Sequence, residues 1–167
     1  MGRGLLITAI LALGLGFVSS APASAGTPEI FSHFYDPGTE IVPSPITCDP
    51  GGSAIHGEAT FGTEAGDDWV GVTTYDYCVY PQAEAGWFSF TGTETLAGTV
   101  RQCGPRPGTM TWSQTGTFHA GTTDGGGNWR VISATDGLGP ARGAGTSTTF
   151  VTDTLENYGY FSGWFHC

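Results

Sequence analysis

The chain contains no lysine, and its 167 residues include only five arginines against 15 acidic residues. The absence of lysine excludes Schiff-base chemistry and the phosphate binding of a Walker-type loop. The low number of positive charges argues against nucleic acids and anionic membrane surfaces as partners, because both are bound through Lys and Arg. We therefore expect no nucleic-acid partner and no membrane partner for the mature chain.

Several common catalytic motifs are missing as well. No G-x-S-x-G, H-E-x-x-H or C-x-x-C pattern occurs, so the sequence predicts neither a hydrolase elbow nor a zinc site. The acidic turns at 67–68 and 124–128 offer oxygen ligands for calcium, but solvated turns are the interpretation that we prefer. We expect no metal and no cofactor.

The first 25 residues have the three parts of a secretory signal peptide. Arg3 precedes an apolar stretch over 4–18, which is too short to span a membrane, and small residues end at Ala25. Cleavage after Ala25 leaves 167 − 25 = 142 residues with a net charge of 4 − 15 = −11. We expect a secreted, extracellular bacterial protein with three parts: the signal peptide 1–25, an extended proline-rich arm 26–47 with one or two short strands, and one β-barrel domain 48–167.

Four cysteines lie in the mature part of the chain, and an even number in an exported protein predicts two disulfides. Three pairings are possible. We expect Cys78 to pair with Cys103, which would link neighbouring strands. Cys48 would then pair with Cys167 and tie the end of the chain to the first core strand.

Alternating apolar and polar residues rich in Thr, Val and aromatics predict β-strands through most of the chain, with little or no helix. One face of a strand carries Trp69, Tyr75, Tyr77 and Val79, and a face of another carries Met110, Trp112 and Phe118. We expect Trp69 and Trp112 in the core. The strand windows are 69–80, 86–100, 108–122, 129–135, 143–154 and 157–167. They predict an all-β fold, a single antiparallel barrel of about eight strands, with a β-sandwich as the alternative.

The glycine-rich stretch "ATDGLGPARGAGTSTTF" over 134–150 has the glycine content of a phosphate loop. A nucleotide-binding loop needs a helix after its glycines, whereas β-branched residues predict a strand here. We therefore interpret Gly137, Gly139, Arg142, Gly143 and Gly145 as a structural turn between two strands, with Arg142 as a tether across it.

Residues 116–148, "GTFHAGTTDGGGNWRVISATDGLGPARGAGTST", resemble the same region of allene-oxide-cyclase-like and dirigent-like barrels, including small secreted bacterial relatives. Ala134, Asp136 and Pro140 stand where that pattern usually has glycine. The resemblance implies an eight-stranded antiparallel barrel with an interior cavity, in a superfamily that includes a cyclase and proteins guiding phenoxy-radical coupling. No catalytic residue of either group is matched here, so none is assigned. The residues that match the bend of the pattern are Thr135, Leu138, Ala141, Arg142, Gly143, Gly145 and Thr146.

Candidate ligand-binding residues come from the aromatic and polar side chains on strand faces. Trp87 and Trp164 share their faces with polar residues and could stack on sugars or aromatic ligands. We add His119, His166 and Glu58 to this candidate set. A carboxylate pair for glycoside hydrolysis would have to come from Glu58, Asp76, Glu84 and Glu94, and depends on their separation.

Three functions follow from these observations. The first is non-catalytic binding of a small apolar or aromatic ligand, or of an extracellular partner. The second is a cofactor-independent isomerase or cyclase that acts inside the barrel, and the third is a carbohydrate-binding module. A cavity lined by a buried carboxylate or histidine favours the enzyme. An exposed row of coplanar tryptophans favours sugar binding, and a smooth apolar cavity favours simple binding.

Overall fold

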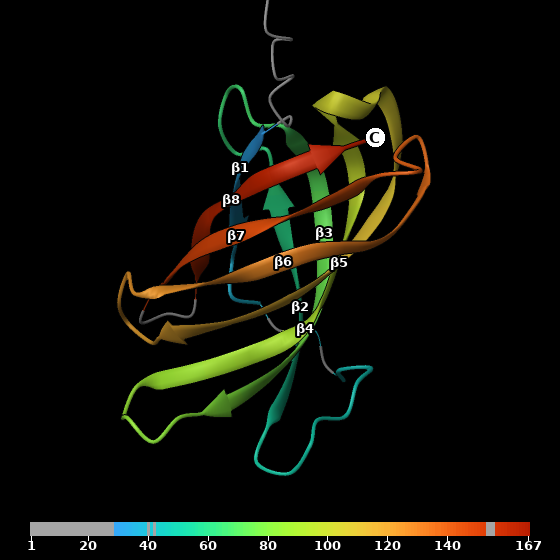
Figure 1. The fold of residues 1–167 in the computed structure, drawn as a ribbon. Helices are drawn as coiled ribbons and strands as arrows, with labels where there is room; N and C mark the ends of the chain where they lie inside the picture. The colour runs from blue at the N-terminus through green and yellow to red at the C-terminus, as the bar shows by residue number, and fades with distance from the viewer. Residues whose placement is uncertain (1–28, 40, 42, 153–155) are drawn as a thin grey trace, which may run out of the picture.

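The computed structural model describes residues 29–39, 41, 43–152 and 156–167, so the expected signal peptide lies outside the described residues. Eight strands follow one another in chain order and close into one antiparallel barrel, which confirms the predicted barrel (Figure 1). A 3-10 turn, Arg101–Cys103, is the only helical element in the described ranges, and no helix there is long and apolar enough to cross a membrane. The strands are β1 (Glu29–Asp36), β2 (Ser53–Phe61), β3 (Trp69–Pro81), β4 (Trp87–Val100), β5 (Gly104–His119), β6 (Gly125–Asp136), β7 (Arg142–Val151) and β8 (Asn157–His166).

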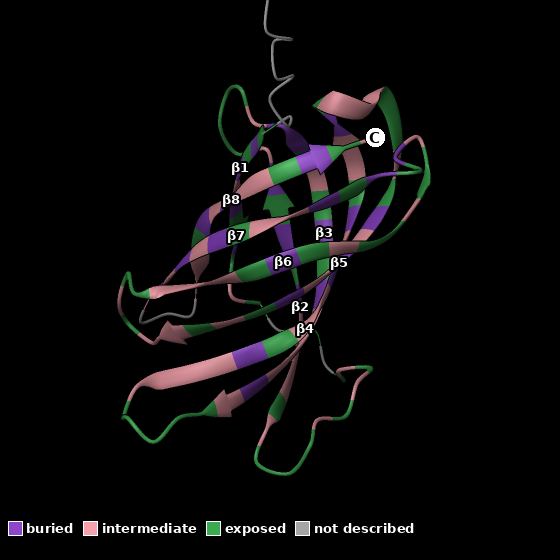
Figure 2. Cartoon of the chain, viewed as in Figure 1, coloured by how far each residue is buried: buried purple, intermediate pink, exposed green. Residues whose placement is uncertain are grey.

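Burial alternates along the strands, because successive side chains point to opposite faces of the sheet (Figure 2). On β3, Trp69, Tyr75 and Val79 are buried, whereas Val70 and Val72 are exposed on the outer face. The predicted grouping of Trp69, Tyr75 and Val79 on one face is therefore confirmed, and this face lines the barrel interior.

One half of the barrel interior is filled by six aromatic rings, which we call the aromatic plug. Ring centroids of neighbouring members lie 5.1 Å to 6.1 Å apart, and the buried rings exclude water from this half. The expected core positions of Trp69 and Trp112 are confirmed. The members of the plug are Phe61, Trp69, Trp112, Trp129, Phe161 and Phe165.

The barrel begins earlier than the sequence suggested. β1 lies inside the range 26–47, which was expected to be an arm with one or two short strands outside the barrel, yet all eight of its residues pair with β8. Figure 1 shows the two strands side by side. No proline occurs between Glu29 and Asp36, since the prolines of this range flank the strand. The domain therefore starts at Glu29 rather than at Cys48.

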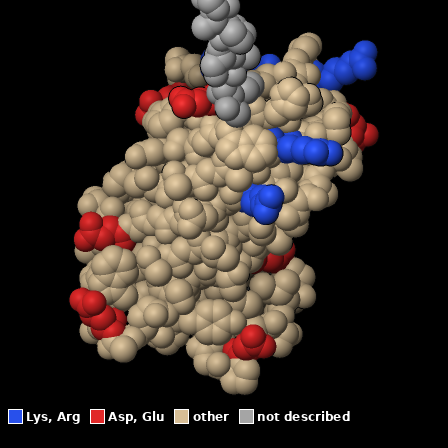
Figure 3. All heavy atoms as spheres, viewed as in Figure 1, with Lys and Arg blue, Asp and Glu red and all other residues tan. Residues whose placement is uncertain are grey.

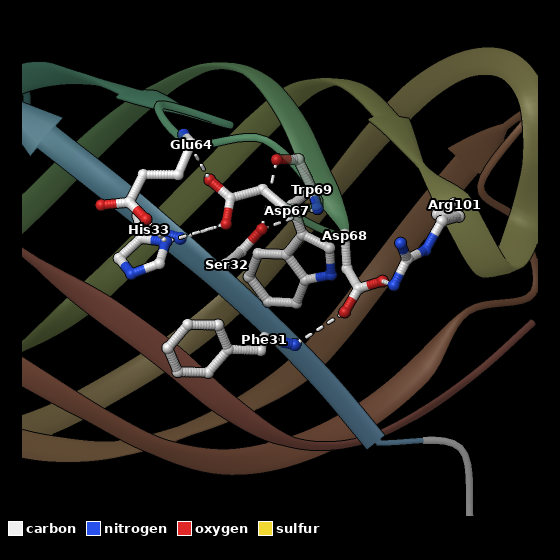
Figure 4. Close-up of polar contacts among 8 residues, drawn as sticks. All are labelled: Phe31, Ser32, His33, Glu64, Asp67, Asp68, Trp69 and Arg101. Carbon is white, nitrogen blue, oxygen red and sulfur yellow. Dashed lines mark hydrogen bonds and ion pairs between the residues drawn. The ribbon is translucent and has the colours of Figure 1, made fainter.

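The seam between β1 and β2 has only two paired positions, and the loop after β2 closes the rest of it (Figure 4). Asp68 Oδ2 accepts a hydrogen bond from the backbone N–H of Phe31 at 2.7 Å, and Asp68 also pairs with the exposed guanidinium of Arg101. Asp67 Oδ1 accepts the backbone N–H of His33 at 3.2 Å and lies 2.9 Å from His33 Nδ1. The expected solvated turn is wrong at 67–68, because both carboxylates are buried and fasten the loop to β1.

The two disulfides are present, but the expected pairing is wrong. Cys48 pairs with Cys78, and Cys103 pairs with Cys167, with Cα atoms 5.5 Å and 5.4 Å apart. Cys78 lies near the end of β3, whereas Cys103 follows β4, which returns along the barrel to the opposite end. Cys78 and Cys103 therefore cannot meet. Each disulfide instead fastens a different end of the barrel.

The glycine-rich stretch forms the bend between β6 and β7, as expected, and a strand follows it. Leu138 is fully buried in the core at this bend. Gly137 donates its backbone N–H to the carbonyl of Pro107 at 3.2 Å, and Gly139 donates to the carbonyl of Asp136 at 3.3 Å. The bend is thus held by backbone hydrogen bonds and by one apolar anchor.

Arg142 pairs with His166 at the start of β7, but its side chain is exposed and makes no hydrogen bond or ion pair with the described residues. Leu138, rather than the expected arginine tether, therefore fixes the bend. Gly143 and Gly145 belong to β7, where a Cβ would collide with the ring of Phe165 at position 143 and with the carbonyl of Ser162 at position 145. These two glycines permit close packing against β8.

Candidate functional site

The half of the barrel beyond the plug contains a cavity of about 190 Å³ that is partly open to solvent. An engineered cavity of about 150 Å³ in another protein takes up benzene, so this one has room for a single ring with a short arm. Most of its wall is apolar, and its polar groups gather at a few positions, as in typical small-molecule sites. The apolar walls are Phe34, Ile55, Ala59, Val79, Phe90, Phe118, Val151 and Phe161.

Glu94 is the central polar group of the cavity. β4 directs it into the barrel on the same face as Leu96, which is fully buried in the core. Glu94 Oε1 accepts a hydrogen bond from the Thr73 hydroxyl at 2.6 Å, and Oε2 lies 3.0 Å from the Tyr77 hydroxyl. Burial raises the pKa of Glu94 from its ordinary value of 4.5 to about 7, although both hydrogen bonds oppose the change.

The Tyr77 hydroxyl lies close to two acceptor oxygens but has only one proton to donate. It lies 3.0 Å from Glu94 Oε2 and 2.8 Å from Gln114 Oε1, and Gln114 directs its amide nitrogen to the Ser147 hydroxyl at 2.7 Å. Burial raises the pKa of Tyr77 well above its ordinary value, so its single proton stays in place. Both contacts are satisfied when Tyr77 donates to Gln114 and a protonated Glu94 donates to the Tyr77 oxygen. The geometry therefore agrees with a neutral Glu94 below pH 7.

A second carboxyl, Asp36, lies at the last position of β1. Its Oδ2 atom accepts the Tyr75 hydroxyl at 2.8 Å, and its Oδ1 atom accepts the backbone N–H of Gly38 at 2.8 Å. Burial raises the pKa of Asp36, and the two hydrogen bonds oppose this change. The rings of Tyr75 and Tyr77 stack with centroids 5.3 Å apart. A stacked tyrosine pair thus stands between the two carboxyls.

The cavity also contains an acceptor without a donor. Asn157 lines the cavity, and its Oδ1 atom is buried with no hydrogen-bond partner among the described residues. A buried acceptor that lacks a donor carries a desolvation cost. A ligand that brings a hydrogen-bond donor would remove this cost.

Interior glycines make the room for the tyrosines. A Cβ at Gly57 would collide with the Tyr75 hydroxyl, and a Cβ at Gly92 would come within 2.6 Å of the Tyr77 ring. Because Gly57 faces inward, its neighbours His56 and Glu58 face outward. His56 Nδ1 lies 2.8 Å from Asp76 Oδ1, and Glu58 is exposed, so the candidate Glu58 lies outside the cavity.

The other predicted ligand-binding residues lie outside the cavity too. Trp87 and His119 pack edge to face at the ends of β4 and β5, with ring centroids 5.3 Å apart. Trp164 is 42% exposed, and its neighbour His166 is exposed, both on β8. The structure therefore brings Trp87 and His119 together, but none of the five residues in the candidate set lines the cavity.

Of the four carboxylates considered as a hydrolytic pair, only Glu94 faces the cavity. Glu84 is exposed in the turn after β3, and Asp76 pairs with His56 on the outer face. Sequence reasoning missed Asp36, which was placed in the arm. The sequence did indicate that Asp36 faces inward. Asp36 lies at the same every-second positions of β1 as the buried apolar residues Ile30 and Phe34.

Comparison with known proteins adds no functional assignment. No protein-family model and no curated protein sequence matches the chain. The functional argument therefore depends on the chemistry of the cavity itself.

Proposed function

We propose that the protein binds one small, largely apolar molecule inside the barrel and holds the polar end of that molecule with Glu94, Tyr77 and Asp36. The observation that carries this proposal is the cavity of about 190 Å³, with its apolar walls and few convergent polar groups. Export through the signal peptide 1–25 is part of the proposal. The two disulfides of the structure are consistent with an extracellular protein.

A relationship to the allene-oxide-cyclase-like and dirigent-like barrels is also part of the proposal. The closed ring of eight antiparallel strands and its interior cavity support it. A shared fold does not identify a reaction.

A second candidate is a cofactor-independent isomerase or cyclase, and Glu94 is the observation that favours it. A carboxyl with a pKa of about 7 exchanges its proton readily near neutral pH, as a general acid or base must. The cavity is lined by a buried carboxyl, and a cavity of this kind favours an enzyme over a simple binding protein. Both candidates require binding in the cavity, and binding is the step that its shape supports directly.

The tryptophans give no support to the carbohydrate-binding module. Trp69, Trp112 and Trp129 are buried in the aromatic plug, and Trp87 packs against His119. Only Trp164 is largely exposed.

Native mass spectrometry tests the binding proposal. The exported protein is incubated with an equimolar mixture of single-ring alcohols, phenols, carboxylic acids and amines, and we expect a 1:1 complex with at least one of them. The matched control is Ile55→Trp, which places a larger ring at a half-exposed position of the cavity wall. Loss of the complex in this folded variant is the expected result. An unchanged complex in Ile55→Trp, or no complex with the wild type, would refute binding in the cavity.

A further inference from the structure

We propose that the ligand of this cavity carries one positive charge, as a primary ammonium group joined by a short arm to an apolar or aromatic body. This inference rests on the proposed binding function and narrows it to one chemical class. Four features carry it: the two carboxyls, the acceptor without a donor, the aromatic walls and the distribution of charge over the barrel.

The polar groups of the cavity are mainly acceptors. Glu94 and Asp36 each have two hydrogen-bond partners, and all four partners are neutral groups. No Arg or His stands among the described residues that line the cavity. Carboxyls as deeply buried as these are normally paired with a cation. An ammonium group supplies both the missing positive charge and three hydrogen-bond donors, one of which suits the buried Oδ1 atom of Asn157.

The aromatic rings around the carboxyls suit a cation with an apolar body. Tyr75 and Tyr77 are stacked, and the Tyr77 ring meets Phe90 edge to face at 5.4 Å. The negative face of an aromatic ring attracts a cation within about 6 Å, and does so more strongly where water is excluded. The same rings repel a carboxylate ligand, which the two acids disfavour as well.

The distribution of charged residues between the two ends of the barrel also favours a cationic ligand. Along the strands, all four arginines of the described residues lie at the height of Trp129 in the plug or farther from the cavity. In the face shown in Figure 3, basic groups occur only in the half toward the plugged end, which carries acidic groups too, whereas the opposite half carries acidic groups without basic ones. Each loop after β3, β5 and β7, at the end where the cavity lies, contributes an acid: Glu84, Asp124 and Glu156. This field attracts cations and repels anions.

Binding of an ammonium ion changes the protonation of Glu94. The titratable groups that face Glu94 are Asp36 from β1 and the tyrosines Tyr75 and Tyr77 from β3, while β5 contributes only the amide of Gln114. Burial raises the pKa of Tyr77 well above its ordinary value, so Tyr77 keeps its proton, and Glu94, with a pKa of about 7, is the group that ionises. The ammonium ion enters with its three protons, and the Glu94 carboxyl releases its proton to solvent. Binding is therefore tighter above pH 7 than below it.

Isothermal titration calorimetry with three ligands of similar size tests the inference: 2-phenylethylammonium, 2-phenylethanol and 3-phenylpropanoate. At pH 7.5 we expect the ammonium to bind at least about tenfold more tightly than the alcohol, and the carboxylate at least about tenfold more weakly than the alcohol. At pH 6, the apparent enthalpy of ammonium binding should vary with the ionisation enthalpy of the buffer, because a proton is released.

Two variants with the same Glu-to-Gln change test whether the preference for the ammonium arises in the cavity. E94Q removes the carboxyl in the cavity, and we expect the ammonium to lose about tenfold in affinity and its proton release, while the alcohol, which has no charge to lose a partner for, loses much less. E58Q removes an exposed carboxyl from the outer face of β2 and should bind all three ligands as the wild type does. D36N is a second cavity variant should E94Q fail to fold, and it should also weaken the ammonium selectively.

The possible failures are distinguishable. Equal affinity for ammonium and alcohol, or tighter binding of the carboxylate, would overturn the positive-charge inference and leave the binding function in place. An equal loss of ammonium affinity in E94Q and E58Q would show attraction by net charge alone, and would also overturn the inference. Binding of none of the three ligands would overturn both the inference and the binding function.

Discussion

The two halves of the barrel interior are built from the same strands but have opposite character. In the plugged half, six aromatic rings fill the space, and Trp69 and Trp112 have no exposed surface. In the cavity half, the same faces of β3 and β4 carry Tyr75, Tyr77 and Glu94 around about 190 Å³ of space. One half therefore stabilises the fold, and it allows the other half to keep buried carboxyls that oppose folding.

This comparison shows why the sequence pattern alone did not locate the site. Alternation predicts which residues face inward, and it treats Trp69 and Tyr75 alike because both are large and aromatic. The difference arises from their neighbours on the adjacent strand β2. Gly57 leaves space for the Tyr75 hydroxyl, whereas Phe61, four residues later on the same face of β2, packs against Trp69.

The largest expected effect is in the plug. Trp112→Ala removes a fully buried ring that contacts Phe61, Trp69 and Phe161, and should lower the free energy of unfolding by about 3–5 kcal/mol. The exposed Trp164→Ala should cost about 1 kcal/mol or less. Urea denaturation of both variants checks this, and a similar loss in the two would contradict the assignment of the plug as the stabilising half.

The pH dependence of Glu94 gives the next effect. Because its pKa is about 7 in the folded protein and 4.5 when unfolded, the folded state binds more protons between these values. Stability from this group is complete below pH 4.5 and is lost as the pH rises to 7, by about 3 kcal/mol in total. E94Q cannot titrate. The difference in unfolding free energy between E94Q and the wild type should therefore change by about 3 kcal/mol in favour of E94Q between pH 4.5 and pH 8.

Denaturant unfolding at a series of pH values measures that difference. A difference that is constant with pH would mean that Glu94 has an ordinary pKa.

A smaller effect is expected where the tyrosines need space. Gly57→Ala places a methyl group against the Tyr75 hydroxyl, and overpacking of this kind costs about 1–3 kcal/mol. Tyr75→Phe removes the hydroxyl and also loses the hydrogen bond to Asp36. A double-mutant cycle should give less than the sum of the two single losses, because the clash is partly relieved. Additive losses would show that Gly57 and Tyr75 act independently.

The smallest effect is expected outside the cavity. Trp87→Ala leaves every cavity-lining residue in place, since Trp87 packs against His119 rather than into the cavity. We expect the affinity for 2-phenylethylammonium to change by less than about twofold, within about 0.5 kcal/mol. Titration calorimetry checks this, and a tenfold loss would place the ligand site at the start of β4 instead.

The fold could largely be predicted from the sequence, because alternation and composition are local properties. The inward face of β5 and the all-β class follow from them directly. The disulfide pairing could not, because it depends on which strand ends meet, and Cys78 and Cys103 lie at opposite ends of the barrel. β1 was hidden by the prolines that flank it.

The site was predicted only in part, for a different physical reason. Glu94 was among the four carboxylates considered, but its selection over Glu84 depends on burial, which no local pattern reports. In the segment His56-Gly57-Glu58 the chemically reactive side chains face outward, and the glycine between them faces the cavity. Attention to reactive residue types therefore selected the wrong face of β2.

The most direct test of the division between the two halves is a ligand titration followed by aromatic 13C NMR. With 2-phenylethylammonium, we predict that the signals of Tyr75, Tyr77 and Phe90 shift in proportion to occupancy, while those of Trp112 and Trp129 in the plug stay fixed. Shifts confined to the exposed aromatic residues Phe31 and Trp164, with the cavity signals unmoved, would contradict the account.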